Sequence, residues 1–294
     1  MKAAFKKELM YFSRTLRMFG VIFAILIFAL FDPIMYKGMV VFIGYVSEQF
    51  ADGVPLADGA RVNVTEQLSG DDDPSGIANP FAGLDEIYGL IGAEETAAAT
   101  VGDFTSTSTL IILLILMQPS GGEQKKRSTI IPQCAGLTSI RYITPKFVIY
   151  PLTAFLSGLV AMPLCAGVSV LLFGGAIPFM SALASGATVG LYLAFLVVVE
   201  LTIGISSARP GFAAIFTILG SSLLPTILAL FRADRFHPFA LPPLASELIT
   251  GDASALNLAV SAAVTVVIGV ILYFTTLLIL NAKRIDNSGN EAVL

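Results

Sequence analysis

The stretch GGEQKKRSTIIPQCAGLTSIRYITPK, residues 121–146, divides two long apolar runs and decides how the rest of the chain is arranged. It is polar and basic, with Lys125, Lys126 and Arg127 in a row. Both neighbouring runs, LIILLILM (110–117) and FVIYPLTAFLSGLVAMPLCAGVSVLLF (147–173), are apolar enough for a lipid bilayer. A charged segment of this length between two spans is a place where a membrane subunit meets a soluble partner. The sequence therefore favours transport driven from outside this chain.

The composition of the 294 residues predicts an all-α polytopic membrane protein. Hydrophobic residues make up 55% of the chain and charged residues 13%, and the mean hydropathy is +0.83. Soluble domains of this length have a far lower hydropathy. The two cysteines, Cys134 and Cys165, are expected to be free thiols, since two cysteines imply no disulfide framework.

Six transmembrane helices are expected, because each needs roughly 20 residues to cross the hydrocarbon core. The first begins near Met18 and continues through Ile34, and the patch Gly38–Val46 either extends it or lies in the interface. The others are expected at 104–117, 147–173, 183–206, 211–231 and 256–280. Residues 18–294 thus form one six-span transmembrane domain. The second span is the least apolar, so its Ser/Thr-rich start must be accommodated by neighbouring helices.

Residues 1–17 are expected to form an amphipathic interfacial helix. Apolar side chains recur at spacings of three and four, at Phe5, Leu9, Phe12, Leu16 and Phe19, and basic residues fill the other side. Such a helix lies on a membrane surface with its cations near anionic headgroups. The alternative is an ordinary basic flank of the first span.

The distribution of cations predicts which side of the membrane each loop occupies. Six spans place both termini on one side, and thirteen of the seventeen Lys and Arg residues fall in the segments on that side. Because cation-rich loops stay in the cytoplasm, both termini and the segment 119–146 are expected to be cytoplasmic. The expected location is the cell (plasma) membrane.

Two further segments lie on the predicted outer side. Residues 45–103 form an acidic loop, in which Asp71, Asp72 and Asp73 are expected to be solvated, since the alternating ligand pattern of a calcium loop is absent. Residues 232–255, before the sixth span, are apolar but interrupted by three prolines. They predict either a re-entrant or interfacial segment or an ordinary amphipathic loop.

The chain lacks the residue patterns of a self-sufficient enzyme. No glycine-rich loop ends in Gly-Lys-Ser/Thr, so no nucleotide phosphate is expected to bind. His237 is the only histidine, which excludes the paired ligands of a zinc protease and disfavours a serine–histidine dyad. No pair of aspartates is expected inside the spans. We expect no metal, no cofactor and no nucleic acid on this chain.

Glu200 is the only charged residue expected deep inside a span, within VVVELTI of the fourth. An ionised carboxylate is costly in hydrocarbon, and such residues often face a cavity or a partner. One interpretation is a polar site on the substrate path or a proton-sensitive switch. The other is a buried glutamate near the inner end, hydrogen-bonded to a serine, a backbone carbonyl or a cation.

The order of these features resembles the membrane (permease) subunits of ABC-2-type ATP-binding-cassette exporters. The resemblance covers essentially the whole chain: a basic amphipathic helix, Pro33 near the outer end of the first span, a variable outer loop, the break SSARP at 206–210 and a proline-containing stretch before the sixth span. It also includes the cytoplasmic residues Glu123, Lys125, Arg127, Thr129, Arg141 and Lys146. The chain departs from the family at Ser128 and at the run 136–141, where members often have glycine and a Pro-Val-Ser-Arg-like sequence.

This resemblance implies a half-transporter. Two subunits, in a homodimer or a heterodimer of paralogues, would work with two separate ATPase subunits that bind ATP and Mg²⁺. The segment 119–146 would be the ATPase-coupling segment, with the residues Glu123, Lys125, Lys126, Arg127, Thr129, Arg141 and Lys146. An ion- or proton-coupled secondary transporter is the first alternative, although such proteins usually show inverted repeats and several midplane charges. An intramembrane enzyme is the second.

Overall fold

The computed structural model describes residues 2–14, 17–51, 54–55, 61–62, 92–117, 122, 138–231 and 236–291. The helices in chain order are α1 (Lys2–Arg14), α2 (Arg17–Ala51), α5 (Ala93–Met117), α8 (Ser139–Phe173), α9 (Phe179–Ser207), α10 (Pro210–Leu230), the 3₁₀ turn η2 (Pro238–Ala240), α11 (Leu241–Thr250) and α12 (Ala255–Glu291). Two-residue strands, β1 (Val54–Pro55) and β2 (Arg61–Val62), pair antiparallel after α2.

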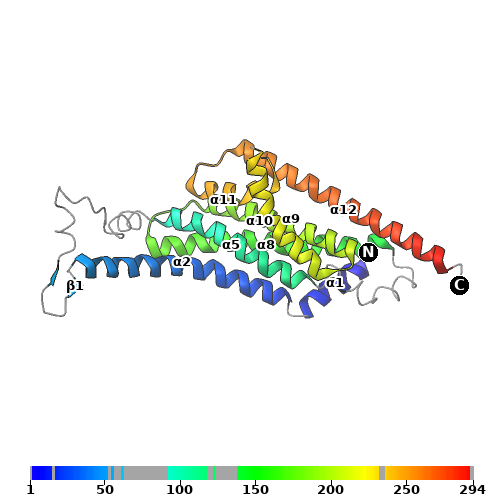
Figure 1. The fold of residues 1–294 in the computed structure, drawn as a ribbon, viewed down its shortest axis with the longest axis horizontal. Helices are drawn as coiled ribbons and strands as arrows, with labels where there is room; N and C mark the ends of the chain where they lie inside the picture. Colours follow the sequence, from blue (N-terminus) through cyan, green and yellow to red (C-terminus); the bar gives the residue numbers. More distant parts are fainter. Residues whose placement is uncertain are drawn as a thin grey trace.

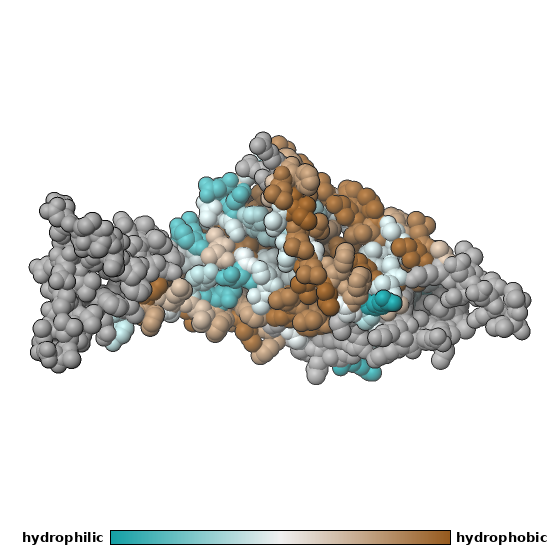
Figure 2. Space-filling view, viewed as in Figure 1, coloured by the Kyte–Doolittle hydropathy of each residue, from teal (hydrophilic) through white to brown (hydrophobic). Residues whose placement is uncertain are grey.

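The predicted all-α polytopic fold is confirmed. Among the described residues, six helices are long and apolar enough to cross a membrane: α2, α5, α8, α9, α10 and α12. Figure 1 shows α1 and the last turns of α12 at the same end of the molecule, as an even number of crossings requires. We call this the α1 end, and the other the loop end. A broad apolar surface crosses the middle of the face in Figure 2, with polar patches on both sides of it.

The first two spanning helices are longer than expected, so the segment between them is shorter than residues 45–103. Helix α2 continues through Pro33 and the apolar patch as far as Ala51, and α5 begins at Ala93. The early start of α5 has a local cause. Its first turns are rich in alanine, and the hydroxyls of Thr96, Thr100 and Thr105 each donate to the carbonyl four residues earlier.

Helix α8 also begins earlier than expected, at Ser139 rather than near 147. It contains Pro145, which lacks the N–H that would bind the carbonyl of Arg141 in the preceding turn. The Thr144 hydroxyl donates to the neighbouring carbonyl of Ile140 at 2.7 Å, so it does not replace the missing bond, and the helix nevertheless continues through Pro145 to Phe173. The last residues of the predicted coupling segment are therefore helical.

Helices α8 and α9 pack with their backbones almost in contact. A Cβ atom added to Gly158 would lie 2.7 Å from the Cα of Gly190, and one added to Gly186 would lie 2.9 Å from the carbonyl oxygen of Gly158. One added to Gly190 would overlap the carbonyl oxygen of Phe155. Small residues four apart, here Gly186 and Gly190, allow such approach between spanning helices. This pair forms the centre of the bundle.

The segment before α12 forms a packed helix. In α11 the side chains of Leu241, Leu244, Ala245 and Ile249 are buried against α5 and α9. The hydroxyl of Ser246 donates to the carbonyl of Ala98 on α5 at 3.0 Å. Gly251, with φ of 83°, then ends α11 in the left-handed region that glycine tolerates best.

Candidate functional site at the α1 end

The residues predicted for ATPase coupling are only partly described. Glu123, Lys125, Lys126, Arg127 and Thr129 lie outside the described residues. Arg141 is exposed in the first turn of α8. Lys146, about one and a half turns further on, is fully buried. Only Arg141 is therefore described on a surface that a partner can reach, while Lys146 acts inside the bundle.

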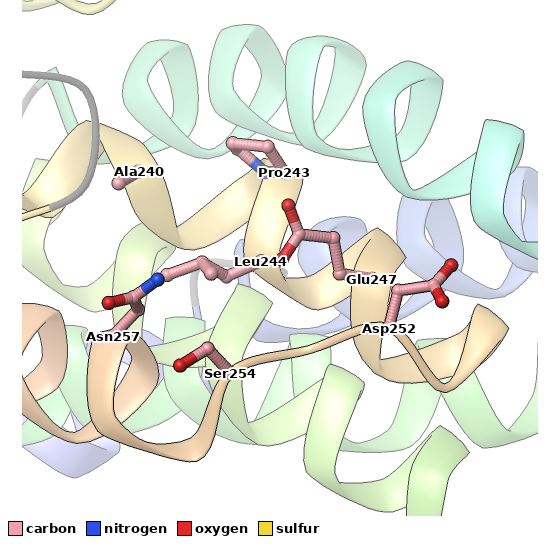
Figure 3. A pocket seen from close by; sticks show the side chains of 7 residues that line it. All are labelled: Ala240, Pro243, Leu244, Glu247, Asp252, Ser254 and Asn257. Carbon is pink, nitrogen blue, oxygen red and sulfur yellow. The ribbon is translucent and has the colours of Figure 1, made fainter.

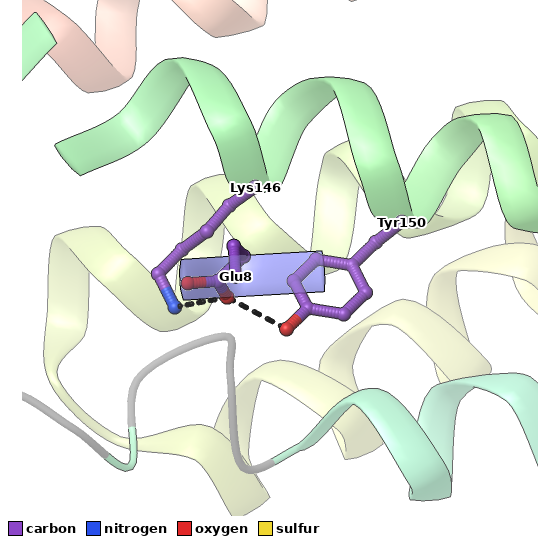
Figure 4. A network of polar contacts seen from close by, with 3 residues as sticks. All are labelled: Glu8, Lys146 and Tyr150. Carbon is purple, nitrogen blue, oxygen red and sulfur yellow. Dashed lines mark hydrogen bonds and ion pairs between the residues drawn. The ribbon is translucent and has the colours of Figure 1, made fainter. Parts of the chain in front are cut away.

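Lys146 joins α8 to α1. Its ammonium group donates to Oε1 of Glu8 at 3.1 Å, and the Tyr150 hydroxyl donates to the same oxygen at 2.7 Å. Figure 4 shows Lys146 and Tyr150 on one face of α8, one turn apart, both directed at Glu8. Lys146 and Tyr150 are each 0% exposed, and Glu8 is 7% exposed. We call this group the α1–α8 contact.

Apolar and aromatic groups seal this contact from solvent. The ring of Phe12 packs edge-on against Tyr150, with centroids 5.3 Å apart, and Phe12 is 1% exposed. The Lys146 ammonium also lies 5.2 Å from the ring centroid of Tyr142, a cation–π distance. Removing either charge would leave the other buried without its partner, at a cost of about 3 to 5 kcal/mol. The contact thus holds α1 to the start of α8.

Sequence reasoning missed the role of Glu8. The predicted apolar stripe of α1 includes Phe12, but Leu9 in that stripe is 54% exposed, and the buried face is instead formed by Glu8 and Phe12. One signal was present: Glu8 is the only acidic residue among the basic residues of this helix, and it lies four residues before Phe12 on the same face.

Glu200 lies on the buried face of α9. It is 0% exposed, and neither carboxylate oxygen has a hydrogen-bond partner among the described residues. The serine, carbonyl or cation expected in one of the two interpretations is thus not found there. Gly190 faces Phe155 across the antiparallel pair, so Glu200, about 15 Å further along α9, lies near the depth of Lys146. Two buried carboxylates, Glu8 and Glu200, therefore occur toward the α1 end.

A second polar group forms where the sequence predicted none. Asp103 lies within α5 rather than in the outer loop, and its carboxylate accepts a hydrogen bond from the Tyr36 hydroxyl of α2 at 2.8 Å. Asp32, one turn before Tyr36, is within electrostatic range of Asp103. The expectation that the spans contain no pair of aspartates is therefore wrong. It failed because α5 begins eleven residues earlier than the apolar pattern indicated.

The loop end carries an open groove of about 600 Å³ between η2, α11 and α12. Figure 3 shows Glu247 and Asp252 near the end of α11, with Ser254 and Asn257 at the start of α12. The hydroxyl of Thr250 donates to Asp252 at 3.0 Å. Within the described part of the chain, no group of three or more His, Cys, Asp or Glu residues is placed to hold a metal ion.

Comparison of the chain with protein-family models, with curated proteins and with solved structures gave no match.

Proposed function

We propose that this chain is the membrane subunit of an ATP-driven exporter of the ABC-2 type. Two copies, identical or paralogous, would work with two separate ATPase subunits that bind ATP and Mg²⁺ on the cytoplasmic side, where both termini lie. The resemblance in the order of sequence features supports this proposal. So do the six spans and the short helix α1 packed at one end of them.

The α1–α8 contact is the observation that carries the proposal. The segment 118–137 connects the end of α5 to the start of α8, and α8 is joined to α1 within its first three turns. A partner that pulls on this segment would therefore move α8 and α1 together. Because both charges of the contact are buried, separating α1 from α8 would leave each charge without its partner, so the two helices are expected to move as one unit.

The proposed coupling reaction requires no chemistry from this chain. Nucleotide-driven closure of the ATPase subunits would displace the coupling segment, held by Glu123, Lys125, Lys126, Arg127, Thr129 and the exposed Arg141. Lys146 would not contact the partner, since it is buried against Glu8. Its role would be to make α1 follow α8.

Charge reversal tests the proposed docking segment. The variant with Lys125, Lys126 and Arg127 all changed to Glu should lower the amount of ATPase co-purified from membranes by about tenfold or more, because like charges then face each other across the interface. The matched control reverses Lys6 and Lys7, which are exposed at the same end on α1, and should keep the partner. Equal yields from both variants and the wild type would refute docking at this segment.

A secondary transporter is the second candidate, and specific observations favour it. The buried Glu200 lacks a hydrogen-bond partner among the described residues, and Asp32, Tyr36 and Asp103 form a polar group between two spans. Intramembrane carboxyl groups often belong to ion or proton paths. This candidate predicts movement of the bundle with pH or an ion gradient in the absence of any ATPase.

A further inference from the structure

A small groove lies between α5, α9 and α10, near the middle of each helix. Its volume is about 270 Å³. The residues that line it carry mostly hydroxyl groups: Thr105, Ser106, Thr109, Leu110, Tyr192, Ile218, Ser221 and Ser222. A concentration of hydroxyls at this depth is unusual for a surface that would otherwise face lipid.

One of these hydroxyls, that of Thr109, is buried without a partner among the described residues. Thr109 is 6% exposed, and its Oγ1 makes no hydrogen bond to the described residues. Tyr192 is 5% exposed, and its only described interaction is an edge contact with the ring of Phe239. A buried hydroxyl without a partner costs about 1 to 3 kcal/mol. A ligand that hydrogen-bonds to Thr109 would recover this cost, and the Tyr192 hydroxyl on the facing helix could bind the same ligand.

The other hydroxyls offer acceptors rather than donors. Thr105 donates to the carbonyl of Val101, Ser106 to that of Gly102, and Ser221 to that of Ile218. Their protons are thus engaged within their own helices, while their oxygen lone pairs remain able to accept. With Thr109 and Tyr192, the groove presents both donors and acceptors, which suits a group that itself carries hydroxyls.

The lining residues carry no charge. No Asp, Glu, Lys, Arg or His is among the described residues that line the groove. A phosphate or ammonium group at this depth would lack a counter-ion, and such a charge is costly in the hydrocarbon region. The groove therefore favours an uncharged headgroup over an ionic one.

The surroundings of the groove indicate that the ligand is an amphiphile. Leu110 of α5, at the edge of the groove, is 46% exposed. Nearby side chains of α5 and α10 are also exposed: Leu114 by 60%, Phe216 by 56% and Leu219 by 52%. Acyl chains can lie against this surface. The volume is below the roughly 300–1,000 Å³ of pockets that enclose a whole ligand, so it fits a headgroup alone.

We propose that this groove binds the uncharged, hydroxyl-bearing headgroup of a membrane amphiphile, such as a glycosyl diacylglycerol. Thr109 and Tyr192 hydrogen-bond the headgroup, and the acyl chains lie along α5 and α10. The identification of this amphiphile as the cargo rests on the proposed exporter function. Its binding to the groove does not depend on that function, because the groove lies within a single chain.

Photolabelling of the purified chain in lipid nanodiscs tests the site without any ATPase. The probe is monoglucosyl diacylglycerol with a photoactivatable acyl chain, and phosphatidylglycerol with the same chain serves as the anionic comparison. We expect the glucosyl lipid to label peptides of α5 or α10, and the anionic lipid to label them several-fold less. Equal labelling by both lipids would overturn the proposal.

Two variants separate the hydrogen bonds from the fold. Thr109→Val combined with Tyr192→Phe should reduce labelling by about tenfold, since each lost hydrogen bond is worth about 0.5 to 1.5 kcal/mol. The control Thr276→Val removes a buried hydroxyl of α12 that bonds within its own helix and lies outside the groove, and it should label like the wild type. Unchanged labelling of the double variant would show that the groove is not the site.

Added glucose distinguishes a lipid headgroup from a free sugar. If excess glucose leaves the labelling unchanged, the acyl chains contribute to binding as proposed. If glucose abolishes it, the groove binds the sugar from water, and the amphiphile proposal fails. Because this assay contains no ATPase, its outcome is independent of whether the chain proves to be an exporter subunit.

Discussion

Helices α9 and α10 are nearly equal in hydropathy but differ sharply in their surroundings. Their most apolar stretches have mean hydropathies of 2.1 and 2.0, yet 72% of that stretch is buried in α9 and only 17% in α10. Helix α9 packs closely against α8 through Gly186 and Gly190. Large side chains such as Phe216 and Leu223 instead point outward from α10. Hydropathy therefore predicts that both helices span, whereas small residues indicate which of them faces protein.

The difference also concerns polar groups. The α8–α9 side contains the ion pair of Lys146 with Glu8, and also Glu200, which has no hydrogen-bond partner in the described part of the chain. The polar residues that α10 contributes to the groove carry only hydroxyls. Along these two helices, the charged groups lie on the side that packs against protein, and the groove beside α10 is lined by uncharged hydroxyls. Four substitutions test this contrast.

The largest effect is expected at the α1–α8 contact. Changing Glu8 to Ala should lower the free energy of unfolding by about 3 to 5 kcal/mol, because the ammonium of Lys146 then stays buried without a counter-charge. Detergent-induced unfolding monitored by circular dichroism measures this loss. The double variant Glu8→Leu with Lys146→Met should recover most of it, and a double variant as unstable as the single one would show that the pair itself is unimportant.

A smaller loss is expected from a methyl group between α8 and α9. Gly190→Ala should destabilise the protein by about 1 to 3 kcal/mol, since the new Cβ would overlap the backbone of Phe155. Gly220→Ala in α10 is the matched control, because its Cβ would meet only the side chain of Leu224 at 3.8 Å. The control should be neutral or slightly stabilising. Equal losses at both glycines would contradict the contrast between the two helices.

Glu200 should behave unlike its buried neighbours on α9. Replacing it by Leu should leave stability unchanged or raise it by about 1 to 3 kcal/mol, since the variant removes a buried polar group that has no described partner. Leu201→Ala, next to it and 0% exposed, should cost about 2 to 5 kcal/mol. A marked loss of stability in Glu200→Leu would mean that the carboxyl group has a structural partner.

The smallest effect is expected on the exposed face of α10. Leu223 is 57% exposed, and Leu223→Ala should change the free energy of unfolding by less than about 0.5 kcal/mol. The same unfolding assay measures it, with Leu193→Ala in α9 as the buried comparison. A loss of more than 2 kcal/mol at Leu223 would indicate that a second chain packs on α10 in the unfolding assay.

The apolar pattern was sufficient to predict the number of spans and the class of fold, because burial in lipid requires about 20 apolar residues per helix. It was insufficient for helix ends. Helix α5 begins among alanines and threonines, before the continuous run of large apolar residues on which the prediction relied, and this error also hid Asp103. Helix α8 likewise begins at Ser139, before the continuous apolar run that starts at residue 147.

The candidate site was less predictable than the fold. Lys146 was selected from the sequence for a role on the surface, yet its partner Glu8 is 138 residues away, and nothing local indicates that the two meet. The hydroxyl-lined groove likewise combines residues from three helices. Contacts of this kind depend on the rotation of each helix about its axis, which hydropathy does not specify. Glu200 was recognisable because an acidic residue inside an apolar run has no solvent-exposed alternative.

The most direct test of the account measures whether the bundle moves only with an ATPase. Spin labels at Lys7 on α1 and Leu230 on α10, both exposed, report their separation by pulsed electron resonance after Cys134 and Cys165 are replaced by Ala. We predict that ATP shifts this distance in the complex with the co-purified ATPase and has no effect on the chain alone in nanodiscs. A shift in the isolated chain on changing pH or sodium, with no ATPase present, would contradict the account and favour a secondary transporter.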